Sequence, residues 1–70
     1  MTAIADRINA LSIPKAEEVY AGLRAMVNEA QAAGRRPADD VRTAMVAAGD
    51  ALEARIGADR FDALMDRCDA

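Results

Sequence analysis

Four aspartates near the end of the chain come closest, in type and spacing, to a chemical site. They are separated by three, four and three residues and are Asp59, Asp62, Asp66 and Asp69. A helix places residues at this spacing along one edge. Such an edge is a candidate binding surface for a basic protein partner. It predicts a cation site less readily, because carboxylate metal sites in helical bundles usually include histidine. The favoured interpretation is a solvated edge whose charge is offset by the interleaved Arg55, Arg60 and Arg67.

The chain offers little for catalysis. It has no histidine, and its one cysteine, Cys68, falls among acidic neighbours on the apolar face of the last expected helix. A nucleophilic thiol needs a base and an electropositive environment, so this position favours a buried structural thiol. The segment from Gly57 to Asp62 resembles the start of the carrier helix in acyl carrier proteins, but Arg60 occupies the position of their modified serine. We therefore expect no catalytic residues, no metal site and no cofactor.

The basic residues form one cluster, Arg35 and Arg36 with Arg42 following. Arg35 near the end of a helix would complement the helix dipole, and contact with an acidic partner is the alternative. The net charge is −3. Residues 1–35 carry four acidic and four basic side chains, so the whole net negative charge lies in residues 36–70. Because nucleic acids and anionic membranes attract basic proteins, we expect neither as a partner.

Apolar periodicity predicts four helices, at about residues 3–11, 14–33, 37–56 and 58–68. The second carries a stripe of Val19, Leu23, Met26, Val27 and Ala30. The third carries Val41, Ala44, Met45, Ala48, Leu52 and Ile56. The short terminal helices carry Ile4, Ile8 and Leu11, and Phe61, Leu64, Met65 and Cys68. The short connection between the second and third helices favours antiparallel neighbours. Their stripes are covered either by the terminal helices or by a second hairpin.

Capping and turn residues mark the expected ends of these helices. Candidate caps and first-turn residues are Thr2, Ser12, Pro14 and Pro37. Gly34 suits the left-handed residue that closes a helix. Gly49, inside the third helix, costs about 1 kcal/mol relative to alanine. Either close approach of another segment or simple tolerance explains it, and tolerance is the favoured interpretation.

Tyr20 and Val46 lie off the main stripes of their helices. A second apolar strip often marks contact with another chain, although the terminal helices could equally cover these positions. The candidate partner-binding residues are Tyr20, Val46, Arg35, Arg36 and the four aspartates Asp59, Asp62, Asp66 and Asp69.

At 70 residues the chain makes one small domain. A core of this size rarely contributes more than about 3–5 kcal/mol without a disulfide, a metal or a partner. One cysteine excludes an internal disulfide, so association with a partner or with itself is favoured. The chain lacks a signal-peptide pattern and a long apolar run, which predicts a cytoplasmic protein outside the membrane. Its alanine and arginine bias indicates a bacterial or phage origin.

The sequence thus predicts an all-α fold, a small helical bundle built on a central antiparallel helical hairpin with short flanking helices. The predicted function is a non-enzymatic protein-interaction module, that is, a small adaptor, inhibitor or accessory subunit of a larger bacterial or phage assembly. Its partner is another protein or a second copy of itself. The alternative is a small dimeric helical DNA-binding regulator, for which only Arg35, Arg36 and Arg42 are available.

Overall fold

A computed structural model describes residues 3–69, and within this range the chain is all-α. It forms the four helices α1 (Ile4–Ala10), α2 (Ile13–Ala32), α3 (Asp39–Ile56) and α4 (Ala58–Asp69). The predicted all-α bundle is confirmed. The observed helix ends differ from the expected ones by at most two residues, which is the ordinary uncertainty in assigning a helix end.

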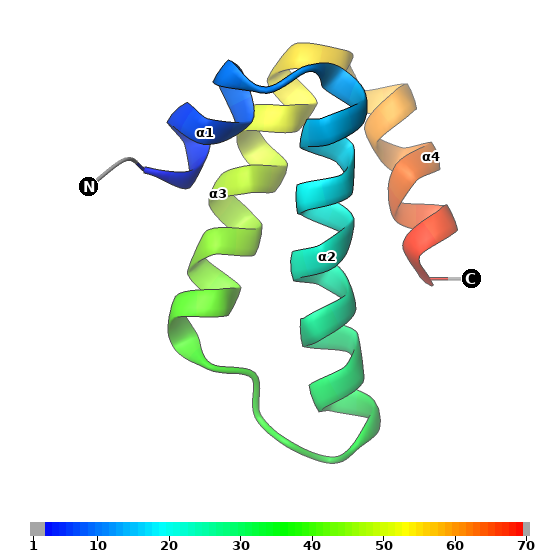
Figure 1. Cartoon of the computed structure of the whole chain (residues 1–70). Helices are drawn as coiled ribbons and strands as arrows, with labels where there is room; N and C mark the ends of the chain where they lie inside the picture. The colour runs from blue at the N-terminus through cyan, green and yellow to red at the C-terminus, as the bar shows by residue number, and fades with distance from the viewer. Residues whose placement is uncertain (1–2, 70) are drawn as a thin grey trace.

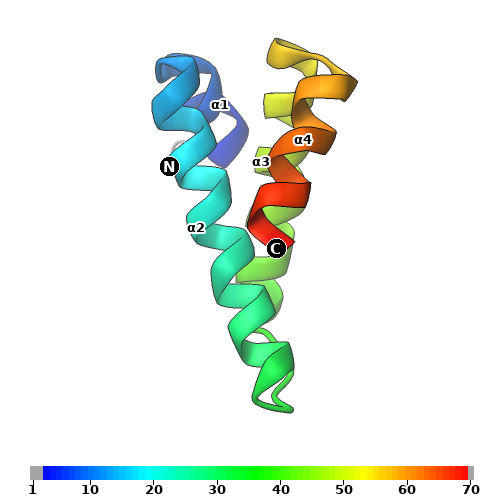
Figure 2. The same ribbon diagram turned by 90° about the vertical axis from the view of Figure 1, so that its right-hand side faces the viewer.

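The helices are arranged around the pair α2 and α3. The chain runs along α2, turns through residues 33–38 and returns along α3, while α1 and α4 flank the pair on opposite sides (Figure 1). Helix α1 packs mainly against α3, and α4 contacts both α2 and α3. Figure 2 shows that α2 and α3 lie close together at the turn and diverge toward the other end. The terminal helices lie at that wider end and supply the apolar surface that closes it.

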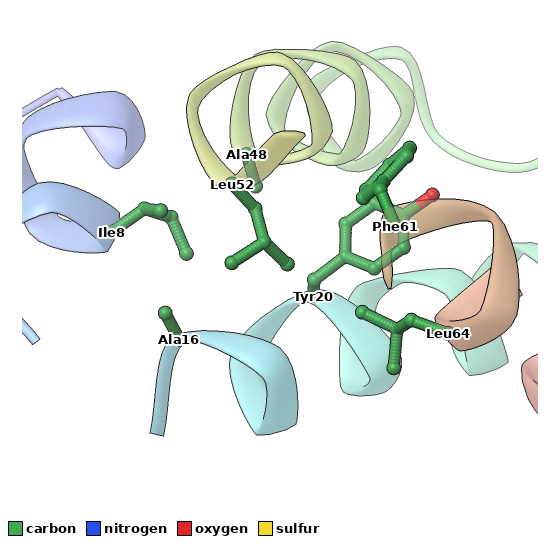
Figure 3. Packing of buried hydrophobic residues seen from close by; sticks show 7 residues of the cluster. All are labelled: Ile8, Ala16, Tyr20, Ala48, Leu52, Phe61 and Leu64. Atoms are coloured by element: carbon green, nitrogen blue, oxygen red, sulfur yellow. The ribbon is translucent and has the colours of Figure 1, made fainter. Parts of the chain in front are cut away.

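The core lies at the wider end and draws on all four helices (Figure 3). Its buried members are Ile8, Ala16, Tyr20, Ala48, Leu52, Phe61 and Leu64. Ile8 and Leu52 are fully buried. Between residues 21 and 47, Val27 alone is buried, and it lies outside this cluster. The half of the α2–α3 pair nearest the turn therefore contributes little to the core.

The buried face of α2 is rotated from the predicted one. The predicted stripe places Met26 inside, but Met26 is 53% exposed, whereas Ala16 and Tyr20 are buried. The rotation results from a tertiary contact between α2 and α4. The Tyr20 ring meets the Phe61 ring of α4, with 5.1 Å between the ring centroids. Docking of α4 therefore turns the Tyr20 flank of α2 toward the core, and Leu23 is left half-buried.

Gly34 ends α2 in the manner predicted. Its φ is 73°, a left-handed conformation that side chains rarely adopt. Its N–H donates to the carbonyl of Gln31 at 3.0 Å, and the N–H of Arg35 donates to the carbonyl of Ala30 at 2.8 Å. These two bonds make a Schellman motif, which satisfies carbonyl groups at the end of the helix.

Gly57, with a φ of 89°, joins α3 to α4 without a loop. Its N–H donates to the carbonyl of Glu53 at 2.8 Å, and its own carbonyl accepts the N–H of Phe61 at 3.1 Å. One residue thus closes α3 and opens α4.

The starts of the two long helices differ from the predictions in detail. Pro37 is expected in the first turn of α3, but Ala38 has extended backbone (φ −61°, ψ 140°), so the helix begins at Asp39. Ser12 occupies the cap position of α2 without a side-chain hydrogen bond to the helix. The expected cap Thr2 lies outside the described residues.

Candidate functional site

Asp69 is paired within the chain. Arg24 of α2 donates two hydrogen bonds to its carboxylate, from Nε to Oδ1 at 2.9 Å and from Nη2 to Oδ2 at 2.8 Å. Asn28 donates a third from Nδ2 to Oδ1 at 3.2 Å. The hydrogen bond from Arg24 lowers the pKa of Asp69, and the same bond raises the pKa of Arg24. Asp69 therefore fastens the end of α4 to α2, which sets it apart from the other aspartates of this helix.

The other three aspartates, Asp59, Asp62 and Asp66, form what we call the acidic edge of α4. All three are exposed, and none makes an ion pair with another residue of the described range. Residues three and four apart on a helix have Cβ atoms about 5–6 Å from one another, so the carboxylates share one edge. Like charges at this spacing repel, which makes the edge mildly unfavourable for the isolated helix.

The arginines expected to offset this charge are directed to other helices. Arg60 donates from Nη2 to Oε1 of Glu17 in α2 at 3.1 Å, and Arg67 lies 4.0 Å from the same carboxylate. Glu17 is largely buried beneath them, with 14% of its side chain exposed. Arg55 donates to two backbone carbonyls at the end of α1. The acidic edge is therefore left without a contacting basic partner in the described part of the chain.

A second candidate surface is a side of α3 on which five residues are exposed. It carries Asp39, Arg42, Val46, Asp50 and Glu53, which we call the α3 outer face. Their separations of three, four, four and three residues place them within about 40° of Val46 around the helix. Val46 is 58% exposed at the centre, and a shallow hollow around it is lined by α3 residues alone. The four charged residues make no ion pair with any residue between 3 and 69.

An open groove of about 480 Å³ runs between α2 and α4. Its lining includes the small and apolar residues Ala21, Ala25 and Leu64. The charged residues Glu17, Glu18 and Arg67 also line it. Sequence reasoning does not single out this groove, because two helices distant in the chain create it. The only local signal is the pair of alanines four residues apart on one flank of α2.

The remaining candidate residues lie in different places. Tyr20 is 3% exposed, so its interpretation as a partner contact is wrong for this structure, because α4 covers it and Arg24 donates from Nη1 to its hydroxyl at 3.1 Å. Arg35 and Arg36 are exposed in the turn, at the opposite end of the molecule from the start of α4 (Figure 1). The structure therefore does not bring this basic pair to the acidic edge of the same chain.

Cys68 is half-buried, packs against the core cluster and lines the groove between α2 and α4. Residues 3–69 contain no group of three or more acidic or cysteine side chains placed to hold a metal ion. No helix in the same range has the length and apolarity needed to cross a membrane.

Comparison with known proteins gives no relative whose properties could be transferred to this chain. No protein-family model, no curated protein and no solved structure matches it significantly.

Proposed function

We propose that this protein is a non-enzymatic protein-interaction module, a small adaptor, inhibitor or accessory subunit, that binds a basic segment of its partner through the acidic edge of α4. The observation that carries the proposal is the direction of the neighbouring arginines. Arg60 and Arg67 reach toward Glu17, and Arg55 reaches toward α1. The carboxylates between them are thereby left without contacts. The bacterial or phage origin and the place in the cytoplasm stay predictions from the sequence.

The chemistry of the edge favours lysine and arginine on the partner. Asp59, Asp62 and Asp66 present three exposed carboxylates along one edge of the helix. Exposed charges of one sign mainly steer association and select the partner, and they contribute less to affinity. Binding through this edge should therefore be fast, and it should weaken as salt is raised.

The test uses a synthetic peptide of alternating lysine and alanine as the probe. Backbone amide shifts of the ¹⁵N-labelled protein are followed as the peptide is added, and the largest shifts are expected at Asp59, Asp62 and Asp66. The double variant Asp62→Lys/Asp66→Lys should bind the peptide at least about tenfold more weakly, because attraction becomes repulsion.

The matched control is Asp6→Lys/Glu29→Lys, which changes the net charge equally at two exposed acids of α1 and α2. It should alter the affinity by no more than about twofold. Equal weakening in both double variants would show that net charge alone attracts the peptide, and the proposal would fail. Shifts centred on the groove between α2 and α4 would also contradict it.

A further inference from the structure

The α3 outer face carries opposite charges at equal distances on the two sides of its centre. Arg42 lies four residues before Val46, and Asp50 lies four residues after it. At 1.5 Å per residue, each charge stands about 6 Å from Val46 along the helix, one positive and one negative. A copy of this face turned end to end would therefore present Asp50 to Arg42 and Arg42 to Asp50.

We propose that a second copy of this chain docks on the α3 outer face, with the two α3 helices antiparallel and a twofold axis passing beside Val46. The two Val46 side chains meet at the axis. Arg42 of each copy then pairs with Asp50 of the partner subunit, so the interface contains two equivalent ion pairs around an apolar centre. Such an isologous arrangement is the commonest form of protein self-association.

The charge order also argues against other occupants. A purely basic segment lying along this face would meet Arg42 as a like charge, and a purely acidic segment would meet Asp50. The same face of an antiparallel copy places Asp50 opposite Arg42 and Arg42 opposite Asp50. Val46, 58% exposed in this chain, is removed from water when the Val46 side chain of a second copy covers it.

One feature of the interface opposes association. Seven residues from Val46 on either side, Asp39 of one copy faces Glu53 of the partner subunit. These pairs stand about 10 Å from the axis, at the exposed rim of the interface, where solvent weakens their repulsion without removing it. Each copy also has a net charge of −3. One helix face per copy makes an interface at the small end of the specific range, below about 1,200 Å² in total, so the dimer should be weak and depend on concentration.

The test is the solution mass of the whole chain by sedimentation equilibrium, from about 10 μM to about 1 mM, where small interfaces associate. The buffer has an ionic strength of about 0.15 M and is reducing. The wild-type chain should shift from monomer to dimer across this range. Arg42→Glu and Asp50→Arg should each remain monomeric, because each places like charges opposite one another twice. The double variant Arg42→Glu/Asp50→Arg should dimerise again, and so should an equimolar mixture of the two single variants.

Two further variants sharpen the test. Glu53→Lys should tighten the dimer, because the new lysine faces Asp39 of the partner subunit. Met26→Lys replaces an exposed large apolar residue of α2 and should leave the dimer unchanged. Circular dichroism spectra check that every variant keeps its helical fold.

A monomer at every concentration overturns the proposal, as does a dimer that survives both single variants or is not restored by the double variant. The outcome of this dimerisation test does not depend on whether the proposed binding through the acidic edge is correct. Peptide binding by Arg42→Glu tests the acidic edge alone, and the mass of Asp62→Lys/Asp66→Lys tests the α3 outer face alone.

Discussion

The ring of Tyr20 packs against the ring of Phe61 beside Gly49, with 5.1 Å between the ring centroids and 53° between the ring planes. A Cβ atom added to Gly49 would lie 3.0 Å from Cε1 of Tyr20 and 3.2 Å from Cζ of Phe61. Both rings are almost fully buried, and the hydrogen bond from Arg24 holds the Tyr20 hydroxyl. Close approach by the aromatic pair, rather than the tolerance favoured from the sequence, accounts for a glycine in the middle of α3.

Gly49→Ala should therefore destabilise the protein. Crowding a packed core costs about 1–3 kcal/mol. That cost outweighs the gain of about 1 kcal/mol from replacing glycine by alanine in a helix. Gly22, inside α2, is the matched control, because an added Cβ would meet nothing within 4 Å. Gly22→Ala should stabilise by about 0.5–1 kcal/mol. Urea unfolding of both variants by circular dichroism checks this pair, and a stabilised Gly49→Ala would contradict it.

Leu52→Ala should be the most damaging single truncation in α3. Leu52 is fully buried at the wider end of the molecule, and removing such a side chain costs about 2–5 kcal/mol. So small a core holds about that much in total, so much of the variant should be unfolded at room temperature. Leu23→Ala should cost less, because Leu23 is half-buried. Met26→Ala should stay within about 0.5 kcal/mol of wild type. Thermal melting curves rank the stability of the three variants. An equal loss of stability in all three would contradict this placement of the core.

Arg55 should hold α1 against α3. Its Nη1 donates to the backbone carbonyls of Ile8 at 2.8 Å and Leu11 at 2.6 Å, which α1 itself leaves without helical partners. Arg55→Met keeps the aliphatic stem and removes these bonds, so it should cost about 1 kcal/mol. The loss should appear as faster amide hydrogen exchange in α1 than in α2. Arg7→Met, the same substitution at an exposed arginine of α1, should leave exchange unchanged; unchanged exchange in both variants would remove Arg55 from this role.

Asp69 should make the attachment of α4 sensitive to acid. Arg24 holds the pKa of Asp69 below its ordinary value of 3.8 in the folded protein. A carboxyl group with a lowered pKa contributes its full stabilisation above the unfolded pKa and loses it as the pH falls through the folded pKa. Asp69→Asn should therefore melt at a lower temperature than wild type at neutral pH, and the difference should shrink below pH 3.8. Asp62→Asn, at a carboxylate without a partner, should show no such loss at neutral pH.

The local pattern of apolar residues in the sequence predicts most of the fold. Ile8, Leu52 and Phe61 are found inside because helical spacing and the surrounding apolar residues already mark them. The rotation of α2 could not be predicted in this way, because it depends on where α4 docks. Tyr20 is ambiguous from the sequence alone, since a tyrosine on the flank of a stripe fits either a partner or a neighbouring helix.

The sequence predicts the spacing of the aspartates along α4, but it does not predict which of them forms an ion pair. The periodicity places Asp59, Asp62 and Asp66 on one edge of α4, and the structure has them there. The periodicity also groups Asp69 with them. In the structure, however, Asp69 is bound by Arg24, which lies 45 residues earlier in the chain. Contacts across that distance follow from tertiary packing, which no local pattern contains.

The one-residue corner at Gly57 has a consequence for how this chain can vary in length. Inserting a single residue between Gly57 and Phe61 would turn the rest of α4 by about 100° and carry the Phe61 ring away from Gly49. The segment 33–38 at the other end of the molecule joins α2 and α3 beyond the core cluster, so an added residue there would change no register inside it. Insertions and deletions should therefore be accepted at the turn and rejected at the corner, which makes the spacing of residues at Gly57 as much a determinant of this fold as their identity.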